Sequence, residues 1–180
     1  MIRHQQLFRH DPENGVYGDC HRTAIACLLD LHPADVPHFG QLCIEASASK
    51  DPYDWRAHEE QWLNERGLTQ AHINFGGSLD QLFDFMDMYN PNVLYLLGGT
   101  SPRGTAHTVI CHGGRLEWDP HPDGGGVPQP MAHKVYEVSF LLPLAMKQPL
   151  PDGMLSSSAG AALRKTIWRG DGCDVEERAP

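Results

Sequence analysis

The periodic spacing of apolar residues constrains the fold of this chain more than any other feature. Helical spacing occurs in three windows, at residues 19–31, 52–66 and 78–89. Short runs rich in β-branched and apolar residues predict strands at 70–75, 93–97, 107–112, 115–119 and 134–142. Helices that come mostly first and strands that come mostly later predict an α+β domain, with helices packed on an antiparallel sheet.

Boundary signals support the three predicted helices. Asp19 and Ser78 stand at N-cap positions, Pro52 opens the middle helix and Gly67 ends it. The first helix is expected to bury a face made of Cys20, Ala24, Cys27, Leu28 and Leu31. The third is expected to bury Leu79, Leu82, Phe83, Met86 and Tyr89.

Length and composition indicate one ordinary globular domain. Of the 180 residues, 41% are hydrophobic and 21% charged. We expect the domain to span residues 1–150 and residues 151–180 to form a peripheral or partly disordered tail.

The net charge of −9, without a Lys/Arg cluster, argues against nucleic acid or a membrane surface as partner. The amino-terminal residues lack the apolar core of a signal peptide, and the five cysteines show no paired spacing. Together these features favour a cytoplasmic location; the oligomeric state is left open.

Three residues in a characteristic order indicate nucleophilic catalysis. Cys20 stands at the start of the first helix, where unpaired N–H groups and the helix dipole stabilise a thiolate and a developing oxyanion. His107 opens one predicted strand and Asp119 closes the next, so they suit a base and its orienting carboxylate. Cys27 fits instead a buried hydrophobic thiol.

The pairing of His107 with Asp119 depends on strand register. A plain two-residue turn at Gly113-Gly114 would place Thr108 opposite Asp119 and send the two side chains to opposite faces. A three-residue loop with a bulge moves Asp119 opposite Val109 and onto the face of His107. We therefore predict a bulged loop spanning 113–115.

Other chemistries fit less well. His107, Cys111, His112 and His121 are suitable zinc ligands, but strand alternation sends His112 to the face opposite His107 and Cys111. No motif singles out a carboxylate pair for glycoside hydrolysis. Gly124-Gly125-Gly126 opens no helix and so does not match a phosphate loop. No cofactor is expected.

Two parts of the chain resemble a known family. The stretch Gly18-Asp19-Cys20 running into an Ala/Leu-rich helix, and Ala106-His107 through Trp118-Asp119-Pro120, are similar to papain-like cysteine peptidases of bacteria and their phages. The branch that processes bacteriocin leaders is the most similar. The resemblance covers about 8–40 and 106–121 and implies a papain-like fold.

The resemblance assigns roles to individual residues. It makes Cys20 the nucleophile, His107 the base and Asp119 the residue that orients it. The family's oxyanion glutamine lies about six residues before the cysteine; that position holds Asn14, so Gln6 is the first candidate and Asn14 the second. The candidate substrate-binding residues are Gly18, Asp19, Gly99, Ala106 and Trp118.

These observations lead to one function hypothesis and two alternatives. The hypothesis is a cysteine hydrolase that cleaves a peptide or isopeptide bond of a protein or peptide substrate through an acyl-enzyme. An acyltransferase with the same triad, or a papain-like binding module without catalysis, are the alternatives.

Overall fold

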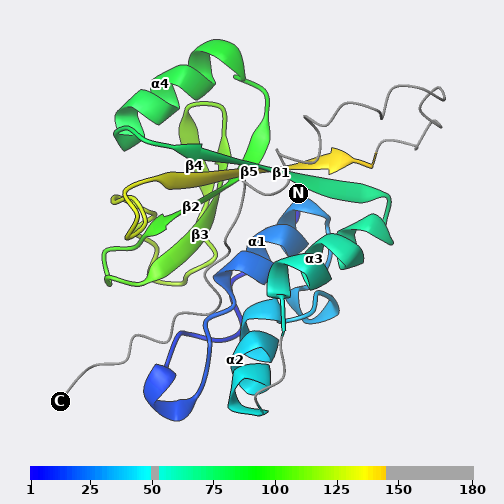
Figure 1. Cartoon of the computed structure of the whole chain (residues 1–180). Coiled ribbons are helices and arrows are strands. Elements are labelled where there is room, and N and C mark those ends of the chain that lie inside the picture. The colour runs from blue at the N-terminus through cyan, green and yellow to red at the C-terminus, as the bar shows by residue number, and fades with distance from the viewer. Residues whose placement is uncertain (50–52, 145–180) are drawn as a thin grey trace, which may run out of the picture.

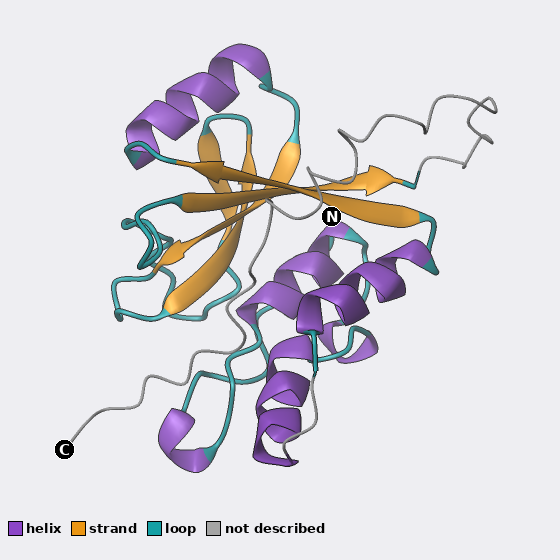
Figure 2. Ribbon diagram, viewed as in Figure 1, coloured by secondary structure: helices purple, strands orange, loops and turns teal. Residues whose placement is uncertain are grey.

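A computed structural model describes residues 1–49 and 53–144 as helices packed on both faces of one antiparallel sheet (Figures 1 and 2). The helices are α1 (Cys20–Leu28), α2 (Phe39–Ser49), α3 (Trp55–Asn64) and α4 (Leu79–Tyr89), with short 3₁₀ turns η1 (Pro12–Asn14) and η2 (Pro33–Asp35). The strands are β1 (Leu68–Phe75), β2 (Leu94–Thr100), β3 (Ala106–His112), β4 (Arg115–Trp118) and β5 (Tyr136–Pro143). The α+β class is therefore confirmed, and the predicted tail at 151–180 lies outside the described residues.

The sheet has the strand order β1-β5-β2-β3-β4 and separates two hydrophobic cores. In Figure 1, α1, α2 and α3 lie together on one side of the sheet and α4 lies on the other. Leu96 and Ile110 face the core beneath α1 and α3, whereas Leu97 and Val109 face the core beneath α4. Both faces of the central strands β2 and β3 are thus buried, as their nearly continuous apolar runs require.

The helix boundaries follow local signals only in part. Ser78 caps α4 with a complete capping box, as its position predicted. Asp19 precedes α1, but its side chain makes no cap hydrogen bond. Asp54 caps α3 at the backbone N–H groups of Arg56 and Ala57, so that helix begins after Pro52, which lies outside the described residues.

The helices differ from the sequence prediction in two respects. The sequence patterns did not predict α2, and Tyr89 at the end of α4 is 65% exposed rather than buried. Tyr89 follows Leu82 and Met86 on the helical stripe but stands in the last turn, where α4 extends past the core. Within the described residues, no helix has the length and apolar character needed to cross a bilayer.

The β3–β4 hairpin has a two-residue turn and a bulge inside the strand pair. His112 pairs with Arg115 across Gly113-Gly114, whose first glycine has φ of 53°. Cys111 then pairs with Leu116, but Ile110 pairs with Trp118 rather than Glu117, so Glu117 is the extra residue. Continuing this register brings Asp119 beside Val109, as predicted, although the bulge is not in the turn at 113–115.

Candidate active site

Cys20 is the first residue of α1 and its thiol is partly exposed. The His107 side chain and the backbone N–H of Thr108 are the groups that favour its ionised form. Burial opposes ionisation of the thiol, but these groups, with the positive charge of His107, outweigh it and lower the pKa of Cys20. The site therefore favours a thiolate at Cys20.

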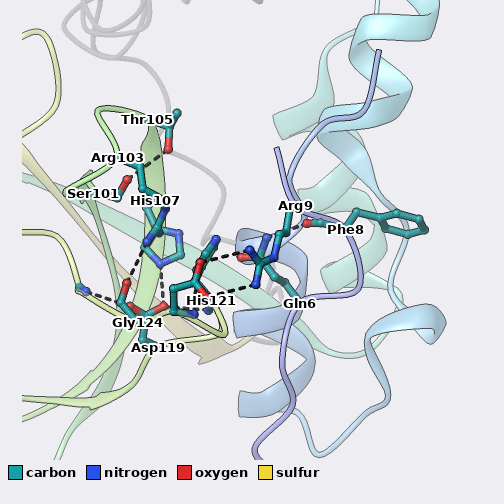
Figure 3. A network of polar contacts seen from close by, with 12 residues as sticks. Gln6, Phe8, Arg9, Ser101, Arg103, Thr105, His107, Asp119, His121 and Gly124 are labelled. Atoms are coloured by element: carbon teal, nitrogen blue, oxygen red, sulfur yellow. Dashed lines mark hydrogen bonds and ion pairs between the residues drawn. The ribbon is translucent and has the colours of Figure 1, made fainter. Parts of the chain in front are cut away.

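His107 lies at the start of β3, is only 3% exposed, and points towards the carboxylate of Asp119 (Figure 3). Its Nε2 lies 2.7 Å from Asp119 Oδ1, which leaves Nδ1 for the contact with Cys20. Burial alone would lower the pKa of His107. The bonds to Asp119 and Cys20 reverse this and raise it to about 9. The lowered pKa of Cys20 and the raised pKa of His107 both shift the pair towards a thiolate beside an imidazolium.

Two backbone N–H groups hold the Asp119 carboxylate in place. His121 N donates to Oδ1 at 2.8 Å and Gly126 N donates to Oδ2 at 2.8 Å. Burial would raise the pKa of Asp119, but the bonds from His107, His121 and Gly126 lower it. The His121 ring also packs edge-on against the His107 ring, with 6.0 Å between centroids.

Sequence reasoning assigned no such role to His121 and Gly126. His121 had been considered only as a zinc ligand, and Gly126 only as part of a glycine-rich loop. The signal present in the sequence was the acceptor itself: an Asp followed by a Pro-containing turn commonly accepts backbone N–H groups further along the chain.

Gln6 is linked to the residue before Cys20 because one carbonyl oxygen accepts hydrogen bonds from both. The oxygen of Phe8 accepts from Gln6 Nε2 at 2.6 Å and from the backbone N–H of Asp19 at 3.3 Å. The backbone N–H of Gln6 also donates to Pro120 O at 2.9 Å. Gln6 is thus held between the residue before Cys20 and the residue after Asp119.

Asn14 lies elsewhere. It ends η1, is exposed, and its side-chain amide donates to Asp11 Oδ2 at 2.7 Å. Asp11 and Val16 exchange two backbone hydrogen bonds of 2.9 Å, so residues 11–16 form a closed excursion from the chain. Asn14 is thus held within this excursion, whereas Gln6 is tied through Phe8 O to the residue before Cys20.

Asp19 is a structural residue rather than an accessible one. It is 1% exposed, and its carboxylate accepts from the backbone N–H groups of Leu7 (3.2 Å) and Phe8 (2.8 Å). Arg22 Nε donates to the same carboxylate at 2.9 Å. These contacts occupy Asp19, so it does not present its side chain to a substrate.

The other four candidate substrate-binding residues differ in accessibility. Gly99 pairs with His107 across β2 and β3 but is buried; a Cβ there would meet Gln129 O at 2.8 Å. Trp118 donates from Nε1 to His4 O at 2.9 Å and so anchors the amino-terminal segment. Gly18 is half-buried against His10, and Ala106 is exposed next to His107. Only Gly18 and Ala106 remain open beside the site.

The remaining free thiols do not belong to this site. Cys27 and Cys111 are buried, and burial raises the pKa of both, that of Cys111 to about 12. Among the residues that the structure describes, no group of three His, Cys, Asp or Glu side chains is arranged to hold a metal ion. The zinc arrangement considered from the sequence is therefore not formed by these residues.

Comparison with known proteins identified no relative of this chain. The chain matches no protein-family model, no curated protein and no solved structure at a significant level.

Proposed function

We propose that the chain is a papain-like cysteine hydrolase of the cytoplasm that cleaves a peptide or isopeptide bond of a protein or peptide substrate. One observation carries the proposal: the thiol at the start of α1 contacts His107, whose Nε2 lies 2.7 Å from Asp119 Oδ1. Cys20 begins α1, His107 lies at the start of β3 and Asp119 follows β4. This is the chain order that the family resemblance implies. A nucleophile, a base and an orienting carboxylate in mutual contact are the parts that acyl transfer needs.

The acylation step follows from the charges of the site. The Cys20 thiolate attacks the carbonyl carbon of the scissile amide, and a C–S bond forms as the carbonyl oxygen becomes an oxyanion. When the intermediate collapses, the C–N bond breaks and His107 gives its Nδ1 proton to the leaving nitrogen. Asp119 holds the other ring nitrogen throughout, which fixes the orientation of the imidazole.

Deacylation returns the enzyme to its starting state. Neutral His107 takes a proton from water, and the resulting hydroxide attacks the thioester carbonyl carbon. The C–S bond then breaks, which releases the carboxylic acid and restores the thiolate–imidazolium pair. An amine in place of water would give the acyltransferase reaction by the same steps.

The oxyanion is stabilised by two donors in this mechanism. The backbone N–H of Cys20 is one, because it belongs to the first turn of α1 and has no intrahelical acceptor. The side-chain NH₂ of Gln6 is the other, since it has two N–H donors and Phe8 O accepts from one of them at 2.6 Å. The excursion at 11–16 accounts for much of the extra spacing between Gln6 and Cys20.

A peptide-library digest tests the proposal. The protein is incubated with a mixture of peptides of varied sequence, and new termini are identified by mass spectrometry. We expect cleavage by the wild type, and its loss in Cys20→Ala and His107→Gln. Cys27→Ser is the matched control, because that thiol is buried in the core beneath α1 and should leave cleavage unchanged where the variant folds.

The outcomes separate the alternatives. An amine acceptor is added in a second incubation. If conjugates with this amine form and no free acid does, the protein is an acyltransferase rather than a hydrolase. No new termini and no conjugates, together with a Cys20 that does not react with iodoacetamide, would favour the non-catalytic binding module.

A further inference from the structure

His21 follows Cys20 directly and, although its side chain is 31% exposed, forms a second ion pair beside the site with a buried carboxylate. Its Nε2 lies 2.9 Å and 3.1 Å from the two carboxylate oxygens of Glu59, which α3 contributes. Glu59 is 3% exposed, and His21 is its only hydrogen-bonding partner among the described contacts. A buried carboxylate of this kind is costly unless a cation faces it.

The second ring nitrogen of His21 also faces an oxygen. Its Nδ1 lies 3.3 Å from Thr108 Oγ1 in β3. A hydroxyl can accept a hydrogen bond, so both nitrogens have acceptors within reach, as a doubly protonated ring requires. The contacts alone therefore favour the imidazolium form of His21.

Thr108 connects this ion pair to the nucleophile. Its backbone N–H donates to the Cys20 thiol, while its hydroxyl contacts His21. Cys20 thus has His107 as one neighbour and the His21 ring, held from the side of α3, as another. Asp119 pairs with Nε2 of His107, and Glu59 pairs in the same way with Nε2 of His21.

We propose that His21, kept protonated by Glu59, is a positioning residue that stabilises the Cys20 thiolate together with His107. This inference rests on the proposed function only in taking Cys20 as the nucleophile. Because the charge of His21 is not used up in proton transfer, it stays beside the sulfur after His107 has protonated the leaving group.

Other charged groups around the pair act in both directions. Burial would lower the pKa of His21, but Glu59, the Cys20 thiolate and Glu137 raise it. Burial lowers the pKa of His72 of β1, which favours its neutral form. The remaining charged or titratable neighbours are Arg56 of α3, paired with Glu137 at 3.7 Å; Arg22 of α1, paired with Asp19; and Tyr17 before α1.

The test measures the thiolate of Cys20 without any substrate. The rate of Cys20 alkylation by iodoacetamide is followed against pH by peptide mass mapping. We expect His21→Gln to raise the pH midpoint and to slow alkylation near pH 6 about threefold to tenfold, as loss of a nearby cation does. His58→Gln, an exposed histidine one residue before Glu59 on α3, is the matched control and should leave the midpoint unchanged.

A double-mutant comparison separates charge from packing. Glu59→Gln alone should slow alkylation near neutral pH, because His21 then loses its proton. In the His21→Gln background the same change should speed alkylation, because it removes a buried negative charge near the sulfur. Equal slowing in both backgrounds would overturn the proposal and leave Glu59 a structural residue.

A direct titration covers the case in which the variants fail to fold. NMR of the wild-type imidazoles should give His21 a midpoint above the ordinary 6.5. A midpoint at or below that value would overturn the proposal. The digest described above is independent: absent cleavage with the expected alkylation profiles would reject the hydrolase function and retain the role of His21.

Discussion

Replacing Asp119 by Asn tests both the catalytic geometry and its structural cost. The carboxylate accepts three hydrogen bonds, from His107 Nε2 and His121 N on Oδ1 and from Gly126 N on Oδ2. Asn has one acceptor oxygen, so its NH₂ group must face either Gly126 N–H or the Oδ1 donors. At least one buried donor then loses its acceptor.

The magnitude follows from the number of bonds affected. An unsatisfied buried donor costs about 1–3 kcal/mol, and the remaining bonds lose the assistance of the charge. We expect a loss of about 2–4 kcal/mol in the free energy of unfolding, or about 5–15 °C in Tm for a chain of this size. The catalytic effect should be larger, about 10²- to 10⁴-fold in kcat, because the imidazolium of His107 loses its counter-charge.

The stability difference should also depend on pH. The raised pKa of His107, about 9, gives stability that is complete below the ordinary 6.5 and is lost as the pH rises through 9. The lowered pKa of Asp119 gives stability that is present above the ordinary 3.8 and is lost as the pH falls through its folded value. The gap between wild type and D119N should therefore be widest between about pH 4 and 6.5.

Thermal denaturation at several pH values, with peptide cleavage at each, measures these effects. Asp123→Asn is the matched control: this exposed carboxylate lies in the same loop, and among the described residues it forms ion pairs with Arg9 and His121. Its Tm should change by no more than about 1–2 °C. Equal Tm and equal kcat for D119N and wild type would refute the assigned role of Asp119.

Three further experiments, one labelling of the wild type and two variants, test other parts of the structure. At pH 7 iodoacetamide should label Cys20 before the buried thiols Cys27 and Cys111, whose pKa values are raised, and peptide mapping that finds either of these first would contradict the site. Deleting Glu117, the extra residue, should turn the bulged pair into a plain ladder in which Asp119 stays opposite Val109, so the pKa of His107 should stay near 9; an NMR titration that finds it near 6.5 would show that the bulge itself, and not the register alone, is needed for the pairing. Asp19→Asn should free the amino-terminal segment and speed its removal by limited proteolysis, whereas equal cleavage rates would show that this carboxylate does not hold it.

The sequence predicted the elements whose signals are local. Three helices and five strands lie where periodicity and caps indicated, because each pattern reflects burial of one face of that element. Helix α2 was not predicted because Pro33 and Pro37, which precede it, indicate a break in the helical pattern. The structure gives Gly40 a packing reason: a Cβ there would lie 2.7 Å from the Tyr17 ring, a contact between segments far apart in the pattern.

The Cys20–His107–Asp119 contacts show where local signals end. The alternation of side chains along the strands required a register shift in the β3–β4 pair and correctly predicted Val109 as the neighbour of Asp119. The predicted position of the bulge was wrong, because Gly113-Gly114 indicated that the extra residue lies in the turn. The structure places it at Glu117, where Arg3 pairs with the bulged side chain. The ion pair between Arg3 and Glu117 joins residues more than a hundred positions apart, and a local sequence pattern does not predict such a contact.

The amino-terminal segment has more influence on the site than its polar sequence indicated. Trp118 binds His4 O, the Gln6 N–H binds Pro120 O, and Asp19 binds the backbone of Phe8. Residues 4–8 thus link the strand end that carries Asp119 to the helix start that carries Cys20. In the proposed hydrolase a shift of about 1 Å between Cys20 and His107 would cost about 100-fold in rate, so we expect changes that release this segment to lower activity.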